Sequence, residues 1–437
     1  MSVIKKKIAG GTTLNIIPTD KFKREYLSVN FLAPLDAATA SLNALTVKVL
    51  RRGTVSYPDM QTISRALDDD YSAELYDRVF KRGETQVFGF SVNTLCGDYA
   101  VDGTDILGQA MGIMGEVMFR PALENGAFRE EYVESEKKNL IDEINAKINN
   151  KNSWAVTRCR EIMCGGERFA VSELGTVEDV GGITAASLYE HYVSVIRSCL
   201  IEIFYVGPAD EDRIASAVKD LMAPLGDVEP RPLGTEVIRR AKHEPEEVVE
   251  DVAVKQGKLI LGFRTDAVLS DEDYHAFTLF SEIYGGSPSS KLFMNVREKL
   301  SLCYYCWAMP DAQKGVMFVS SGIENEKKQV AEDEILNQLR NTAEGDITDE
   351  EFDAAKKSLV NAYKEIYDAP VSLESWYMGR MLAGREDSPL ENAEKIMSVT
   401  KEQAAAKARA VTLDTVYFMH GTEKTDDENG GDEDVSE

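Results

Sequence analysis

Histidine is scarce in this chain, which has only four in 437 residues, at His191, His243, His275 and His420. No two of them are close in sequence, so none has the paired spacing with which histidines commonly ligate a catalytic zinc ion. We therefore interpret all four as surface or packing residues. The six cysteines are too few for a disulfide framework in so long a chain and are typical of reduced thiols.

Long apolar runs and an excess of positive charge are also absent. No apolar run approaches the roughly 18 to 20 residues that span a bilayer, and the basic stretch at residues 1–7 is not followed by the apolar region of a signal peptide. The net charge of −26 argues against nucleic-acid binding, because phosphate contacts need a basic surface. The sequence predicts a cytoplasmic protein with neither membrane nor nucleic-acid partners.

Common catalytic patterns are missing as well. The chain has no Gly-x-Ser-x-Gly elbow, no Walker loop and no dinucleotide fingerprint. Cys303 and Cys306 have the spacing of a redox pair, but they stand at the entry of an apolar strand, where residues i and i+3 are expected to face opposite sides. A thioredoxin-like pair stands at a helix N-terminus instead. We therefore expect no redox site at these cysteines.

The sequence contains the same order of elements twice, which predicts two duplicated α+β domains. Each half has strands clustered before helices, which indicates a mostly antiparallel sheet with helices packed on one face. In the first half, residues 5–18 and 26–32 read as strands and residues 38–52 as a helix. We predict a first domain at 1–225, a linker at 226–246, a second domain at 247–421 and a disordered acidic tail at 422–437.

One segment of the second half carries a family resemblance. Residues 285–304 read as a Gly-Gly turn, an amphipathic helix ending in charge, and a strand that opens on tyrosines. This segment resembles the pitrilysin/insulinase-type zinc peptidases, the M16 family, whose arginine and tyrosine at this place hold the substrate backbone. The matching residues are Arg297 and Tyr304. The structural alternative is that Arg297 compensates a helix dipole and that Tyr304 is a half-buried strand aromatic.

The first half resembles the same family at the helix that carries its inverted zinc motif, His-x-x-Glu-His. Here the motif positions hold Ala44, Val47 and Lys48, so both histidines and the glutamate are replaced. In the family a later helix supplies a third zinc ligand, a glutamate, with a helper glutamate seven residues earlier. Glu143 and Glu136 have that spacing, and on a helix they lie about 20° apart. The alternative is that both glutamates belong to the charged rim of an amphipathic helix and have no other role.

The resemblance implies a non-catalytic subunit that forms a heterodimer with a zinc-bearing paralogue. The partner would bring the zinc, this chain would bring Arg297 and Tyr304, and a peptide would bind as an added strand in a shared proteolytic chamber. We expect no metal and no cofactor in this chain. Within the family the chain resembles the bacterial insulinase-like proteins associated with elongation factor P modification.

Two alternatives stay open at this point. The chain could be a scaffold or binding protein with the same fold, as are the core subunits of the respiratory bc1 complex. It could also be a self-sufficient metallopeptidase with unrecognised ligands, which the low histidine count argues against.

The replaced motif also predicts a specific contact. Lys48 lies on a helix with apolar neighbours, and a buried ammonium is costly unless it is paired. Glu143 and Glu136 would repel each other without a metal. We therefore predict that the Lys48 ammonium lies within about 4 Å of one of these carboxylates, as an ion pair requires. In the alternative, Lys48 extends to water.

Overall fold

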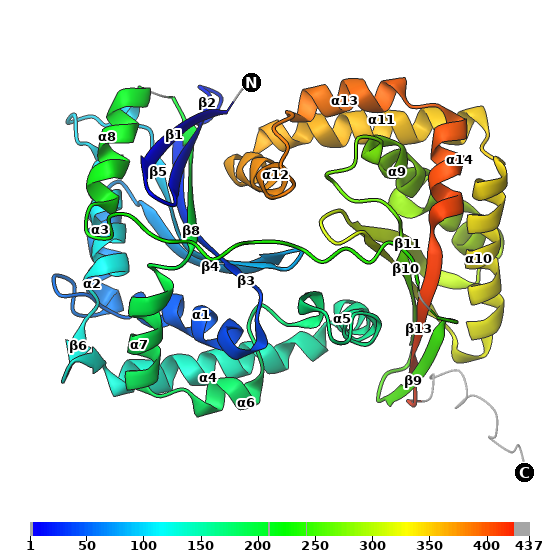
Figure 1. The fold of residues 1–437 in the computed structure, drawn as a ribbon, viewed down its shortest axis with the longest axis horizontal. Coiled ribbons are helices and arrows are strands. Elements are labelled where there is room, and N and C mark those ends of the chain that lie inside the picture. Colours follow the sequence, from blue (N-terminus) through cyan, green and yellow to red (C-terminus); the bar gives the residue numbers. More distant parts are fainter. Residues whose placement is uncertain (1–2, 209, 242, 424–437) are drawn as a thin grey trace, which may run out of the picture. The chain divides into compact units, whose positions relative to one another are not determined.

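The computed structural model describes residues 3–208, 210–241 and 243–423 (Figure 1). Its internal contacts divide the chain into two compact units. The first contains the described residues of Met1–Ala146, Glu167–Glu236 and Glu365–Pro389, and the second contains those of Lys147–Gly166, Val237–Lys364 and Leu390–Glu437. From residue 424 onward, the predicted tail lies outside the described residues.

The first unit is built on a sheet with the strand order β1-β2-β8-β3-β5-β4. The β2–β8 pair is parallel and the other neighbouring pairs are antiparallel. The strands are β1 (Ile4–Ala9), β2 (Thr12–Pro18), β3 (Arg24–Pro34), β4 (Glu74–Arg82), β5 (Thr85–Leu95) and β8 (Leu200–Gly207). A short hairpin, β6 (Leu123–Glu124) and β7 (Ala127–Phe128), stands apart from this sheet.

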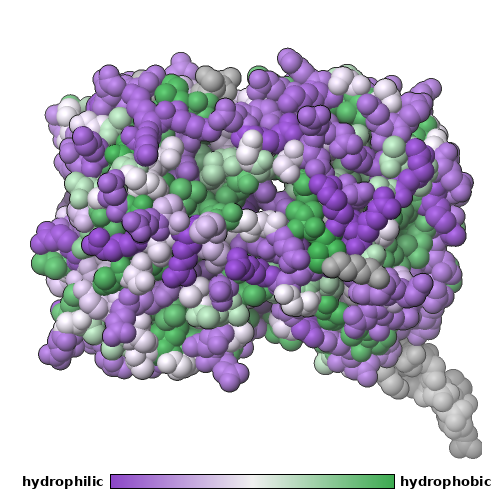
Figure 2. Space-filling view, in the orientation of Figure 1, coloured by the Kyte–Doolittle hydropathy of each residue, from purple (hydrophilic) through white to green (hydrophobic). Residues whose placement is uncertain are grey.

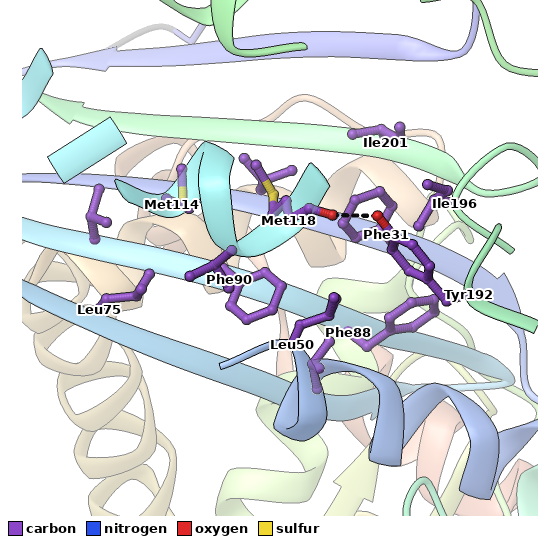
Figure 3. Close-up of a cluster of buried hydrophobic side chains, with 14 of the residues drawn as sticks. Phe31, Leu50, Leu75, Phe88, Phe90, Met114, Met118, Tyr192, Ile196 and Ile201 are labelled. Atoms are coloured by element: carbon purple, nitrogen blue, oxygen red, sulfur yellow. Dashed lines mark hydrogen bonds between the residues drawn. The ribbon is translucent and has the colours of Figure 1, made fainter. Parts of the chain in front are cut away.

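Most helices of the first unit cover one face of its sheet. Apolar side chains of this face and of the helices form the larger core, part of which Figure 3 shows around Phe88, Phe90 and Met114. Within it, the Tyr192 hydroxyl donates a hydrogen bond to the Met118 carbonyl at 2.7 Å. The helices of this core are α1 (Ala37–Leu50), α2 (Met60–Asp69), α3 (Ile106–Phe119), α4 (Glu130–Ala146), α6 (Val177–Gly182), α7 (Ala185–Val195) and α8 (Glu211–Met222).

The opposite face of the first sheet is covered by α12 (Pro370–Leu382), which comes from the second half of the sequence. Leu373, Tyr377 and Met378 of α12 pack with apolar side chains of β2, β3, β5 and β8. Strand β5 is buried along most of its length for this reason, since both of its faces are covered.

The second unit has a sheet with the strand order β11-β12-β10-β13-β9. The β13–β9 pair is parallel and the other neighbouring pairs are antiparallel. The strands are β9 (Glu246–Val252), β10 (Gly257–Arg264), β11 (Cys303–Asp311), β12 (Val316–Ile323) and β13 (Thr412–Gly421). The mostly antiparallel α+β architecture predicted for each half is confirmed.

The helices of the second unit include one from the first half of the sequence. Helix α5 (Lys151–Met163) packs on β10 and β13. A Cβ atom at Gly262 of β10 would lie 2.6 Å from the Met163 sulfur, so the glycine permits this close approach. The other helical elements are α9 (Tyr274–Ser281), η4 (Glu282–Gly286), η5 (Leu292–Lys299), α10 (Lys328–Glu344), α11 (Asp349–Glu365), α13 (Pro389–Ser398) and α14 (Lys401–Ala410).

Aspartate residues that cap the helix N-termini mark where α3 and α1 begin. Helix α3 begins at Ile106, after Asp105, whose carboxylate caps it by accepting a hydrogen bond from the Gly108 amide at 3.2 Å. Helix α1 begins after Asp36, whose carboxylate accepts from the Ala38 amide at 2.9 Å.

The described part of the predicted linker, up to residue 245, contains neither helix nor strand.

The surface is mainly hydrophilic. Figure 2 shows hydrophilic residues over most of the visible face of both units, with hydrophobic residues scattered among them. Among the described helices, none has the length and apolar character needed to cross a bilayer.

Candidate functional site

The motif helix α1 packs against α4, which carries Glu136 and Glu143. Ala44 and Val47 are 0% and 1% exposed and belong to the apolar core of the first unit. Neither side chain has an atom that can ligate a metal. The helix is buried along most of its length, as the sequence predicts, and Lys48 is the basic residue of its last turn.

Lys48 forms the predicted ion pair. Its Nζ lies 2.9 Å from Glu143 Oε2, with the lysine side chain 19% exposed and that of Glu143 48% exposed. Asp77 of β4 is a second neighbour, with its Oδ2 atom 4.0 Å from the same nitrogen. The alternative, in which Lys48 meets only water, is therefore wrong.

Glu136 is neutralised by a different cation. Arg52 Nη1 donates to Glu136 Oε1 at 3.1 Å, and Asn139 Nδ2 donates to Oε2 at 3.2 Å. The Arg52 guanidinium also lies over the Tyr132 ring, 5.6 Å from its centroid. The Glu136 side chain is 10% exposed, so this pairing offsets the cost of burying its charge.

These residues do not fit a zinc ion. A catalytic zinc site needs three protein ligands and an open position, whereas Ala44 and Val47 present only methyl groups. The Lys48 ammonium, already a cation, is bound to the carboxylate that would be the third ligand. Within the described ranges, no group of three or more histidine, cysteine, aspartate or glutamate side chains could hold a metal ion.

The histidines lie apart from these positions and have other partners. His191 of α7 contacts α1, since its Nε2 lies 2.7 Å from Asn43 Oδ1. Burial, together with the nearby Arg231 charge, lowers the pKa of His191 to about 4. His275 Nε2 lies 2.8 Å from Asn392 Oδ1, His420 pairs with Asp251, and His243 Nδ1 lies 2.9 Å from the Glu244 carbonyl.

Arg297 and Tyr304 belong to neighbouring elements of the second unit. Arg297 is on η5, which packs against β11, and Tyr304 is the second residue of β11. The Arg297 guanidinium lies over the Phe293 ring at 4.5 Å and pairs with Glu298 at 3.2 Å. Tyr304 is 63% exposed, which is more than the half-buried strand aromatic of the structural alternative.

The arrangement of Cys303 and Cys306 differs from the prediction. Both lie on the same face of β11. Cys303 and Cys306 are 9% and 0% exposed. Their partners in β12, Ile323 and Ser321, are two residues apart and therefore share a face of the sheet. The cause is an irregularity in β11 that places an extra residue, Tyr304, between Cys303 and its neighbours.

This irregularity also brings the two thiols together. The hydrogen bond from Cys306, followed by one from Ser321 and by the Arg297 charge, lowers the pKa of the Cys303 thiol, while burial raises that of Cys306. Both cysteines are free thiols. The bulge has a second effect, because it turns Tyr304 outward beside them.

The comparisons with known proteins agree with this geometry. The family description "Peptidase M16 inactive domain" matches residues 182–359. The "Probable inactive metalloprotease YmfF" of Bacillus subtilis (strain 168) is 34% identical over 417 residues, which cover 95% of this chain and 97% of that protein. The chain belongs to the M16 peptidase family. Its motif positions hold Ala44, Val47 and Lys48 in place of the histidines and the glutamate of the catalytic M16 motif.

Solved structures share the M16 fold over nearly the whole chain. A conserved protein from Enterococcus faecalis V583 has a TM-score of 0.90 and 28% sequence identity, covering 98% of this chain and all of that one. A peptidase M16 inactive domain from Pseudomonas fluorescens has a TM-score of 0.79 and 18% identity, covering 97% of this chain and 100% of that one.

Three charged residues beside the motif positions were not predicted as part of the site. Arg52 and Arg51 were interpreted only as the end of the motif helix, yet Arg52 binds Glu136 and Arg51 binds Asp77. A signal was present, because two arginines directly after a helix with buried neighbours need carboxylate partners. Asp77 had no such signal, since its approach to Lys48 depends on how β4 lies beside α1.

Proposed function

We propose that this chain is the non-catalytic subunit of an M16 heterodimer, in which a zinc-bearing paralogue carries out hydrolysis. Arg297 and Tyr304 of this chain would bind the peptide in a chamber shared by both subunits. The chain itself would hold no cofactor and act in the cytoplasm. The six cysteines, all free in the structure, are consistent with that reducing compartment.

The observation that carries the proposal is the contrast between the two sets of family positions. At the metal positions the carboxylates are already bound by Lys48 and Arg52. At the substrate positions, by contrast, Tyr304 is 63% exposed, and the described residues give its side chain no hydrogen bond, while Arg297 pairs with Glu298, whose side chain is half exposed.

The strand that carries Tyr304 also suits an extended peptide. Strand β11 is an edge of its sheet, because β12 is its only neighbour in the described sheet. Unpaired backbone groups at such an edge can bind a peptide as an added strand. Trp307 and Met309 of β11 are 44% and 36% exposed and could contact its side chains.

The experiment is reconstitution with an M16 paralogue from the same genome that has an intact His-x-x-Glu-His motif. We expect a stable complex that cleaves unfolded peptides. Arg297→Ala and Tyr304→Phe should each lower kcat/KM of the complex by about 10² to 10³, the usual cost of one preorganised donor at a developing oxyanion. Lys299→Ala, which removes an exposed charge from the same segment, is the control and should have no effect.

The outcomes separate the alternatives. Full activity in both variants would show that these residues are structural and that the helper mechanism is wrong. A stable complex whose peptidase activity equals that of the paralogue alone would favour the scaffold function. Failure of the two chains to associate would refute the pairing itself.

A further inference from the structure

A cavity of about 430 Å³ opens in the first unit, at the N-terminal half of α1. Its wall combines the end of β3, the first turns of α1, the end of α7 with the residues that follow it, and two segments that approach from residues 168 and 231–232. All of these lie in one compact unit. The volume is within the range of about 300 to 1,000 Å³ that is common for small-molecule sites.

The charge of this cavity is opposite to that of the protein. Arg168 and Arg231 line it together with one acidic residue, Asp36, in a chain whose net charge is −26. The Asp36 carboxylate already accepts the capping hydrogen bond from the Ala38 amide. The described structure gives neither guanidinium an ion pair or a side-chain hydrogen bond, so both are available to a ligand.

Neutral hydrogen-bonding groups complete the wall. Thr39, Ser194 and Ser198 line the cavity. The Ser198 hydroxyl donates to the Val195 carbonyl at 3.3 Å, which leaves the hydroxyls of Thr39 and Ser194 as donors for a ligand. His191 lines it too, one turn before Ser194 on α7. Its low pKa of about 4 leaves the imidazole uncharged at neutral pH, so the positive charge of the cavity comes from the two arginines.

A chain of hydrogen bonds fixes the tautomer of this histidine. Gln86 Nε2 donates to the Ala40 and Glu173 carbonyls, which leaves Gln86 Oε1 to accept from Asn43 Nδ2 at 2.8 Å. Asn43 Oδ1 then accepts from His191 Nε2 at 2.7 Å. The wall is therefore held rigid from the core, which reduces the ordering cost of binding.

We propose that this cavity binds a small molecule that carries a phosphoryl group. Two arginine forks and the hydroxyls of Thr39 and Ser194 offer more donors than the two oxygens of a carboxylate can accept, whereas a phosphate monoester has three terminal oxygens and nearly two charges. Arginine forks match phosphate oxygens in bidentate geometry. A bare phosphate ion would leave much of the volume to water, so an ester fits the cavity better.

The test is isothermal titration calorimetry of the full chain with glycerol phosphate, inorganic phosphate and citrate at one fixed ionic strength. Glycerol phosphate is expected to bind saturably at one site. Arg168→Gln and Arg231→Gln should each weaken binding about 10- to 100-fold, the effect of losing one charge-assisted hydrogen bond. Arg65→Gln removes an exposed arginine of α2, gives the same change in net charge, and should leave the affinity unchanged.

Each outcome is decisive. Binding of inorganic phosphate as tight as that of the ester would keep the phosphoryl site and identify the free ion as its ligand. The proposal is overturned if neither phosphate probe saturates, if citrate binds as tightly as the ester, or if Arg65→Gln weakens binding as much as the cavity variants. Thermal melts of the three variants, expected to match the parent, show that the fold is intact. None of these outcomes bears on the proposed heterodimer with a zinc-bearing paralogue.

Discussion

The Nζ atom of Lys48 lies 2.9 Å from Oε2 of Glu143, and both residues stand at positions that the family resemblance assigns to zinc ligands. A side-chain cation thus stands against the carboxylate that would otherwise ligate the metal. It joins α1 to α4, as a bound metal would, but it cannot activate water for hydrolysis. Replacing the second motif histidine by lysine therefore keeps the contact between the helices while removing the chemistry.

Lys48→Met tests whether this ion pair stabilises the fold. Methionine keeps the apolar stem but leaves the Glu143 and Asp77 carboxylates with less positive charge nearby. Because the lysine side chain is 19% exposed and Glu143 is 48% exposed, we expect a loss of about 1 kcal/mol in the free energy of unfolding, at the upper end for partly exposed pairs. Urea unfolding at neutral pH measures it.

The matched control is Lys138→Met, which removes an exposed lysine from α4 and should leave stability unchanged. Equal stability of Lys48→Met and the parent protein would contradict a stabilising role for the pair.

Glu374 should be essential for the stability of the first unit. It is fully buried on α12, and its carboxylate accepts hydrogen bonds from Tyr26, Ser28, Asn30 and Arg78 at 2.5 to 3.0 Å. Glu374→Ala would leave the Arg78 charge buried without its partner, so we expect a loss of about 3 to 5 kcal/mol. Chemical denaturation measures this loss.

The exposed Glu365 provides the control for that experiment, since Glu365→Ala should change little. A cost for Glu374→Ala below about 1 kcal/mol, the range of an exposed ion pair, would show that α12 does not depend on this cluster.

Glu202 should make stability depend on pH. It is 4% exposed on β8, and burial raises its pKa from 4.5 to about 7, although Asn15 Nδ2 donates to it at 2.7 Å. A carboxyl whose pKa is raised on folding stabilises the protein below its unfolded pKa, and this contribution is lost as pH rises through the folded value. The affected window therefore runs from about pH 4.5 to about pH 7.

Glu202→Gln stays neutral and should remove that dependence. Relative to the parent, we expect little difference at about pH 5 and a gain of up to about 3 kcal/mol at about pH 8, measured by urea unfolding. Glu190→Gln, at an exposed position of α7, is the control. Parallel stability curves for Glu202→Gln and the parent would refute the buried, proton-binding carboxyl.

Local patterns predicted the sheets, the main helices and the Lys48 contact, because alternation, helical spacing and the cost of a buried charge all act over short stretches of sequence. The sequence did not predict that each sheet is covered by a helix from the other half of the chain. Helix α12 covers the first sheet and α5 covers the second, yet nothing near either helix in sequence indicates which sheet it contacts. Gly262 is explained by α5 only once the two are seen together.

The candidate site shows the same limit. Alternation along a regular strand places Cys303 and Cys306 on opposite faces, and a single bulged residue reverses that result and exposes Tyr304. A bulge depends on how the partner strand pairs, so the sequence of β11 alone does not reveal it.

Zinc content, measured together with peptidase activity, tests the central claim most directly. The purified chain is equilibrated with zinc, desalted and subjected to elemental analysis, with a zinc-bearing M16 paralogue as the positive control. Because Lys48 and Arg52 already neutralise Glu143 and Glu136, we predict no stoichiometric zinc and no cleavage of unfolded peptides by this chain alone. About one zinc per chain, as in a catalytic M16 site, together with cleavage that a chelator abolishes, would contradict the account.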